Sequence, residues 1–265
     1  MEPVKLGDFL KWEPHYPEAI IGEGVLHVMN KLIMYGREGI GKSMLAMNLD
    51  MSLIGGVPWA GFDIKGDNHK VFYLQMEIPH PLLHKRLMKM YNAWKVLYGD
   101  KNGNMLDRFY VWTEPFLKLD NPTGYKFLRM QLERVRPTVL IVDPLYKALS
   151  GNILDPNSAR AFVDSMDMLI TEFQFSLVLI HHTRKGKIDE DQDMNPNEDM
   201  LGSAVFSWWA DTIVKVIKKG EKDRKVLIQL NFDKVRHAED VVEPREVIFD
   251  REDLMFYSAE KKIVV

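Results

Sequence analysis

Residues 36–43 read Gly-Arg-Glu-Gly-Ile-Gly-Lys-Ser, which fits the GxxxxGK[ST] pattern of a phosphate-binding loop. The apolar run Leu32–Tyr35 before it predicts a short buried strand, and residues 44–49 after it predict the first turns of a helix. A strand, a glycine-rich loop and a helix in this order are the context that this motif requires. The stretch therefore predicts a site for the phosphates of a nucleotide at the start of a helix.

Each residue type in the loop suits one part of a nucleoside triphosphate. The glycines let the chain turn tightly, so we expect successive backbone N–H groups to face the phosphates. Lys42 supplies a positive charge for the β- and γ-phosphates, and the Ser43 hydroxyl is a candidate ligand for Mg²⁺. The expected cofactors are ATP and Mg²⁺. The residues predicted to bind the nucleotide are Gly36, Arg37, Glu38, Gly39, Ile40, Gly41, Lys42, Ser43 and Met44.

Composition sets the broad class of the protein. A length of 265 residues suits one large α/β domain, or one domain with a short appendage. The absence of cysteine excludes disulfides and thiolate metal sites and is typical of a cytoplasmic protein. Apolar runs fall short of the ~20 residues that span a bilayer, so we expect no membrane association. A net charge of −3 does not exclude DNA, because a ring can concentrate its cations in a channel.

The pattern after residue 30 alternates between strands and helices. Strands are predicted at 71–76, 109–112, 139–142 and 176–180, with helices at about 82–94, 123–136 and 157–174. Three strands close the chain, at 213–217, 226–230 and 247–249, with a hairpin turn at 219–223. We therefore expect an α/β fold with a mostly parallel central sheet, helices on both faces and C-terminal antiparallel strands. Residues 1–30 are expected to be a lead-in segment packed on this core, and residues 31–265 the nucleotide-binding domain.

Two carboxylates follow apolar strands of the predicted sheet. Asp143 ends the run Val139–Val142 and is a candidate to hold Mg²⁺ beside the phosphate-binding loop. Glu77 ends the strand 71–76, where the RecA-type branch of these ATPases carries a Glu that polarises the attacking water. The alternatives are a turn or helix N-cap for Asp143 and an exposed strand end for Glu77.

His181 and His182 end the strand 176–180. A polar side chain at this place could touch the γ-phosphate and report its presence to the following loop. Neighbouring residues in a strand point to opposite faces, and no further ligand types are near in the sequence, which disfavours a metal site.

The order of these segments resembles one family. Gly36–Ser43, Glu77, Asp143-Pro144-Leu145, the run 181–186 (His-His-Thr-Arg-Lys-Gly) and Gly202-Ser203 are similar to the RepA-like group of RecA-fold hexameric ATPases. These are plasmid and phage replicative helicases, related to the DnaB-like helicase motor. The resemblance covers about residues 20–250. It implies a RecA-like P-loop NTPase fold, nucleotide chemistry carried by Lys42, Ser43, Glu77 and Asp143, and γ-phosphate sensing by His182, with His181 as second candidate.

Lys234-Val235-Arg236 follows the strand 226–230 and resembles the Lys-x-Arg element of DnaB-like motors. In those motors the two cations reach the γ-phosphate bound by a neighbouring subunit, so the resemblance implies catalytic roles for Lys234 and Arg236 in trans. A solvated charge pair in a turn is the alternative. Relatives often carry Arg directly before the Gly-Ser pair, where this chain has Leu201. If that Arg serves coupling or interface contacts, either another cation replaces it here or activity is weaker.

Residues 185–200 contain hardly any apolar side chain and predict a solvated loop. Arg184, Lys185 and Lys187 are candidate contacts to DNA phosphates, although the acidic run 189–191 fits poorly with contact to the DNA backbone. A surface loop without DNA contact is the alternative. Trp208 and Trp209 favour a helix core or a subunit contact over base stacking.

The sequence thus predicts a Mg²⁺-dependent ATPase that assembles as a ring, most simply a hexamer, and moves on single-stranded DNA in replication. The expected partners are further copies of the chain, single-stranded DNA, and a primase or other replication proteins. Two alternatives use the same core. One is a RecA-like recombination or annealing mediator, and the other is a KaiC-like regulatory ATPase without unwinding activity.

Overall fold

The computed structural model describes residues 3–13, 19–99, 105–183 and 204–259. The strands in chain order are β1 (Ala19–Ile21), β2 (Leu26–His27), β3 (Lys31–Gly36), β4 (Val71–Gln75), β5 (Phe109–Thr113), β6 (Val139–Asp143), β7 (Ser176–His182), β8 (Thr212–Lys222), β9 (Lys225–Val235), β10 (Arg245–Asp250) and β11 (Phe256–Ser258). The helices are α1 (Leu6–Phe9), α2 (Lys42–Gly55), α3 (His80–Tyr98), α4 (Pro122–Val135), α5 (Pro156–Phe173) and α7 (Ala204–Trp209), with short 3-10 helices η1 (Met105–Arg108) and η2 (Leu145–Ala148).

One large sheet organises these elements. Within the described residues its order is β11-β10-β9-β8-β3-β7-β6-β4-β5, and β8, β3, β7, β6, β4 and β5 run parallel to one another. Strands β9, β10 and β11 extend it in antiparallel fashion. The predicted mostly parallel sheet with antiparallel C-terminal strands is confirmed.

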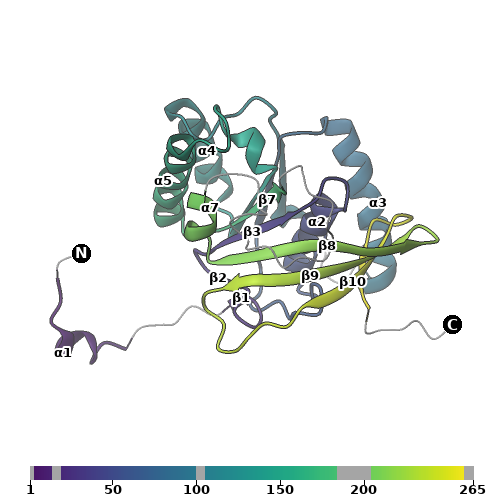
Figure 1. Cartoon of the computed structure of the whole chain (residues 1–265), viewed down its shortest axis with the longest axis horizontal. Helices are drawn as coiled ribbons and strands as arrows, with labels where there is room; N and C mark the ends of the chain where they lie inside the picture. Colours follow the sequence, from purple (N-terminus) through teal and green to yellow (C-terminus); the bar gives the residue numbers. More distant parts are fainter. Residues whose placement is uncertain (1–2, 14–18, 100–104, 184–203, 260–265) are drawn as a thin grey trace.

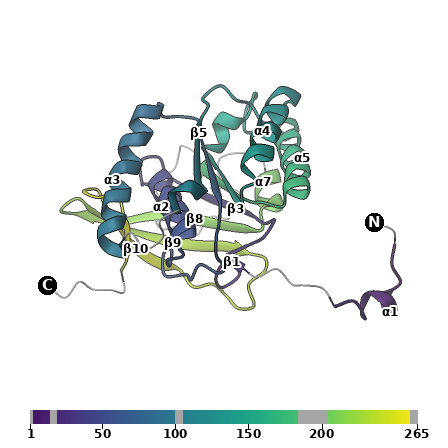
Figure 2. The same ribbon diagram turned by 180° about the vertical axis from the view of Figure 1, so that it is seen from behind.

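Helices cover both faces of the sheet, as the buried strands require. Figures 1 and 2 show α2 and α3 on one side and α4, α5 and α7 on the other. Each face has its own apolar core. Alternate residues of one strand divide between the two cores: Val178 and Ile180 of β7 pack toward α2, whereas Leu177 and Leu179 pack toward α5.

The parallel strands place their carboxyl ends at one edge of the sheet. Gly36 of β3 lies opposite His182 of β7, and Gln75 of β4 lies opposite Asp143 of β6. Ligands of open parallel sheets bind beyond this edge, so the register alone brings the predicted site residues to the same region.

The hairpin between β8 and β9 differs from its prediction. The turn was expected at residues 219–223, but β8 continues to Lys222 and the turn consists of Asp223 and Arg224, whose φ angles are 50° and 65°. Positive φ at both central residues is the geometry of a two-residue hairpin turn. The charged residues 219–223 indicated a turn because they are solvated. Strand pairing uses backbone groups, however, so exposed strands such as β8 and β9 tolerate charged side chains.

The described part of the first thirty residues consists of an exposed segment and a hairpin with buried side chains. β1 and β2 form a small antiparallel hairpin, and Ile20, Ile21, Val25 and Leu26 in and around it are buried. The described residues 3–13 are all exposed. The division of the chain at residue 30 stays a prediction. Among the described residues, we find no helix with the length and apolarity to cross a membrane.

Candidate active site

The phosphate-binding loop occupies the turn between β3 and α2. Gly41 precedes the first helical residue with a φ of 100°, a conformation that side chains disfavour. A Cβ on Gly36 would approach the Val216 carbonyl oxygen of the neighbouring strand at 2.5 Å, so the strand end also requires glycine. The loop therefore has the strand–loop–helix geometry that its sequence predicts.

Lys42 closes the loop on itself. Its ammonium donates hydrogen bonds to the carbonyl oxygens of Gly36 at 2.8 Å and Arg37 at 2.7 Å, and the residue is only 5% exposed. Burial lowers the pKa of Lys42 to about 8, and the nearby carboxylates of Asp143, Glu38 and Glu77 oppose this shift. These backbone contacts hold the ammonium at the loop, where phosphates would compete with the carbonyl groups for it.

Asp143 ends β6 with its carboxyl group buried, at 1% exposure. Tyr73 on β4 donates its hydroxyl hydrogen bond to Asp143, and the Gln75 amide nitrogen lies 3.4 Å from the same oxygen. The Ser43 hydroxyl also interacts with this carboxyl group. Burial raises the pKa of Asp143, while the hydrogen bonds from Tyr73 and Ser43 counteract that rise. The predicted pair Ser43 and Asp143 is thus brought together.

Glu77 lies on the exposed turn after β4. Its carboxylate accepts a hydrogen bond from the Tyr146 hydroxyl at 3.0 Å, and its backbone N–H donates to the Gln75 side-chain oxygen at 2.6 Å. Burial and the bond to Glu77 raise the pKa of Tyr146 to about 12, so the phenol stays protonated and keeps donating at neutral pH. Side chain and backbone of Glu77 therefore both have defined partners.

The two histidines diverge, as neighbours in a strand do. His182 is half-buried at the cavity, 5.5 Å from the Tyr146 ring, and burial lowers its pKa, with the charge of Lys42 acting in the same direction. His181 is fully buried on the opposite face, where its ring lies 6.3 Å from Phe206. Of the two candidates, only His182 faces the phosphate-binding loop. No cluster of metal-ligand type is found in the part of the chain that the structure describes.

A cavity of about 500 Å³ joins these groups. Gly36, Arg37 and Ile40, although predicted to bind the nucleotide, are not among the residues that line it. The lining includes Glu38, Gly39, Gly41, Lys42, Ser43, Met44, Glu77, Asp143 and His182 from the predicted set, and Arg86, Ile180, Arg224, Phe249, Arg251 and Leu254, which sequence reasoning missed. Arg86 lies on α3, nine residues after Glu77. This spacing matches no motif, so the sequence offered no reason to propose Arg86. The last four come from turns and strands of the antiparallel extension, whose approach to the loop no local pattern signals.

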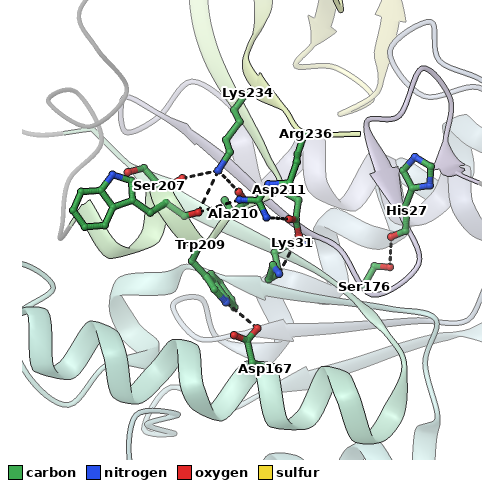
Figure 3. Close-up of polar contacts among 11 residues, drawn as sticks. His27, Lys31, Asp167, Ser176, Ser207, Trp209, Ala210, Asp211, Lys234 and Arg236 are labelled. Carbon is green, nitrogen blue, oxygen red and sulfur yellow. Dashed lines mark hydrogen bonds and ion pairs between the residues drawn. The ribbon is translucent and has the colours of Figure 1, made fainter. Parts of the chain in front are cut away.

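Lys234 and Arg236 lie elsewhere. Lys234 lies near the end of β9 and Arg236 follows that strand, which pairs there with the start of β8. Both residues therefore lie at the end of the parallel strands opposite to the phosphate-binding loop. Lys234 donates to the carbonyl groups of Ser207, Trp208 and Ala210 at the end of α7. Figure 3 shows both cations directed at this helix end.

Arg236 contacts Asp211 and the end of α7. Its guanidinium contacts Asp211 at 2.8 Å and the Trp208 carbonyl oxygen at 3.2 Å. Asp211 also accepts from the backbone N–H and the ammonium of Lys31, at 3.0 and 3.1 Å (Figure 3). Burial lowers the pKa of Lys234, and the charge of Arg236 adds to this effect. Arg184, Lys185, Lys187 and Leu201 lie outside the described residues.

Comparison with known proteins fixes the family. A family model described as an AAA domain, AAA_25, aligns with residues 1–187. The chain belongs to the AAA_25 family. No curated protein matches this AAA_25 chain.

Solved structures confirm the fold of this AAA_25 member. It is similar to a solved structure described as an ATPase domain, with a TM-score of 0.63, 13% identity, and coverage of 87% of this chain and 84% of that one. It is also similar to a KaiC-like protein of the hyperthermophilic archaeon Pyrococcus horikoshii OT3, with a TM-score of 0.60, 9% identity, and coverage of 92% and 100%. A DnaB-like replicative helicase, solved for its interactions with primase, gives a TM-score of 0.63 and 12% identity. There 86% of this chain is covered, but only 57% of the helicase.

The predicted RecA-like fold and the relationship to DnaB-like ATPase domains are therefore confirmed at the level of fold. A shared fold does not by itself assign an activity, which depends on the residues of the site.

Proposed function

We propose that this chain hydrolyses ATP at the subunit interfaces of a ring and uses the hydrolysis to move on single-stranded DNA in replication. The observation that carries the proposal is the meeting of Lys42, Ser43, Asp143, Glu77 and His182 around one cavity. A phosphate-binding loop alone would account for nucleotide binding. The carboxylates of Asp143 and Glu77 beside it also suit hydrolysis of the nucleotide. Similarity to a solved ATPase domain and to a DnaB-like replicative helicase supports the choice of DNA motor.

The residues present fit a Mg²⁺ ion. Ser43 offers a hydroxyl oxygen and Asp143 a buried carboxylate beside it, and Mg²⁺ prefers oxygen ligands of this kind. When bound with ATP, the ion would offset negative charge on the β- and γ-phosphates. Ser43 would hold it directly, and Asp143 through water.

The protein's own groups supply the remaining steps. Glu77 takes a proton from the attacking water, and Tyr146 orients the Glu77 carboxylate through the 3.0 Å hydrogen bond. Lys42 turns from the Gly36 and Arg37 carbonyls to the phosphates, where its charge stabilises the transition state. His182, neutral at pH 7 because its pKa is lowered, senses the γ-phosphate by hydrogen bonding.

Motion would reach DNA through residues 184–200, which follow β7 and Thr183 in the sequence. Arg184, Lys185 and Lys187 remain our candidates for contacts to DNA phosphates. Arg236, with Lys234 beside it, remains the candidate finger toward the neighbouring subunit's γ-phosphate. Both assignments come from the resemblance to hexameric helicases.

The deciding experiment measures steady-state ATP hydrolysis with and without single-stranded DNA, with Lys42→Ala as the blank. We expect stimulation by DNA of at least about tenfold, and loss of all turnover in Lys42→Ala, because the phosphates lose their cation. Strand displacement on a forked duplex then separates a helicase from a recombination mediator. No hydrolysis by the unaltered protein would refute the proposal.

One observation favours a second candidate. The fold of the KaiC-like protein matches over 92% of this chain. A regulatory ATPase on this core would hydrolyse ATP slowly and respond to a protein partner. Turnover that is unchanged by single-stranded DNA would favour that candidate.

A further inference from the structure

Gln75 connects the Asp143 carboxylate to the backbone of the turn that carries Glu77. It is the last residue of β4, it is 2% exposed, and it lies opposite Asp143 in the parallel register. Its side-chain nitrogen lies 3.4 Å from the Asp143 carboxylate. Its side-chain oxygen accepts hydrogen bonds from the backbone N–H groups of Glu77 at 2.6 Å and Ile78 at 3.2 Å.

These contacts take the place of the backbone hydrogen bonds between β4 and β6, which end at this point. The last backbone bond between β4 and β6 joins the Met76 N–H to the Asp143 carbonyl oxygen at 2.8 Å. The next two N–H groups, of Glu77 and Ile78, need other partners as the chain turns toward α3. One amide oxygen serves both, so the conformation of the turn that carries Glu77 depends on this side chain.

The orientation of the amide is fixed by its surroundings. An amide offers an acceptor at one end and two donors at the other. The reversed orientation would set its NH₂ group against two N–H donors and its oxygen against a carboxylate. A third hydrogen-bonding group, the Tyr73 hydroxyl, holds the same Asp143 oxygen from the side. The Asp143 carboxylate, Gln75 and the Glu77 backbone therefore form one continuous chain of contacts.

We propose that Gln75 is a positioning residue that fixes the Glu77 turn relative to Asp143 and so aligns the general base with the bound nucleotide. The inference rests on the proposed hydrolysis of ATP. Gln75 itself is not among the residues that line the cavity. Its effect should therefore appear in the rate of hydrolysis and leave the affinity for nucleotide without Mg²⁺ unchanged, because the contacts of Lys42 are separate from it.

The test begins with Gln75→Met, which keeps the length of a buried side chain and removes both polar functions. We expect kcat to fall about 10- to 100-fold, as for other changes to residues that orient catalytic groups. The Kd for ADP, measured without Mg²⁺, should stay within about threefold of the unaltered protein. Gln131→Met, the same change on α4 away from the cavity, is the matched control and should leave both values unchanged. Gln75→Asn, too short to reach both partners, serves if Gln75→Met does not fold.

A double-variant cycle separates positioning from general structural damage. In a Glu77→Gln background, adding Gln75→Met should slow single-turnover hydrolysis by less than about twofold, because the group that Gln75 aligns is already gone. An equal loss in both backgrounds, or unchanged kcat in Gln75→Met, would overturn the inference.

Hydrogen exchange gives a readout that does not need turnover. The amides of Glu77 and Ile78 should exchange at least about tenfold faster in Gln75→Met than in the unaltered protein, and those of β6 should not. Unchanged exchange at Glu77 and Ile78 would overturn the inference even if the protein hydrolyses nothing. If Glu77→Gln slows hydrolysis and Gln75→Met does not, only the role of Gln75 fails and the proposed function stands.

Discussion

The burial of Lys42 predicts a pH dependence of nucleotide binding. Burial lowers the pKa of its ammonium to about 8 in the free protein, whereas bound phosphates favour the charged form. Above that pH the free protein has lost the proton and binding must take one up, so affinity falls as pH rises. We expect the Kd for ADP, measured without Mg²⁺, to increase by up to about tenfold per pH unit above pH 8.

Titration of ADP binding from about pH 7 to about pH 9.5 measures this slope. Lys42→Ala is the control, since it should bind ADP weakly and with a flat profile over the same range. A flat profile in the unaltered protein would show that Lys42 keeps its proton throughout, and that its burial does not govern affinity.

At the residue scale, the sequence predicts the residues that would act on the nucleotide. It does not reveal the residues that position those side chains. Lys42 and Ser43 stand in a fixed motif, and Asp143 and Glu77 end apolar strands, so all four could be proposed from pattern and resemblance. Gln75 gives no such signal, because its role depends on the strand opposite it. His182 was the first candidate and His181 the second, and the alternation of β7 places only His182 at the cavity.

At the scale of elements, every predicted strand of the parallel core is present, since long apolar runs bounded by polar residues identify buried strands. The partners of the antiparallel extension could not be predicted in detail. The β8–β9 turn is displaced to Asp223 and Arg224, and Phe249 of β10 reaches the phosphate-binding loop at Gly41. Both features depend on how far the antiparallel strands of the extension continue into solvent. Hydrophobic periodicity gives no information on that length.

The junction of α7, β8 and β9 gives a prediction at this scale. Asp211 is buried and holds Lys31 and Arg236, so Asp211→Ala should lower the free energy of unfolding by about 2 kcal/mol. The Arg236 side chain is 47% exposed, so Arg236→Ala should cost less than about 1 kcal/mol. If Arg236 also serves a neighbouring subunit, the same change should lower ATP hydrolysis about 1,000-fold or more.

Urea unfolding and ATPase rates of both variants check this contrast. A stable Arg236→Ala protein with full activity would leave Arg236 only its contacts with Asp211 and Trp208. A large loss of stability in Arg236→Ala would instead make its activity uninformative, and Arg236→Lys, which keeps the charge near Asp211, would then report on the finger alone.

At the scale of the whole molecule, a finger in trans predicts that two inactive variants rescue each other. In Lys42→Ala the phosphate-binding loop fails but Arg236 is intact, and in Arg236→Ala the reverse holds. In a ring mixed from equal amounts, about one interface in four joins an intact loop to an intact Arg236, so activity should recover to at most about a quarter of the unaltered rate. Mixing the purified variants with ATP and single-stranded DNA measures this directly. Each variant mixed with unaltered chains is the control for subunit exchange. No recovery, in rings shown to exchange subunits, would mean that each active site is completed within its own chain.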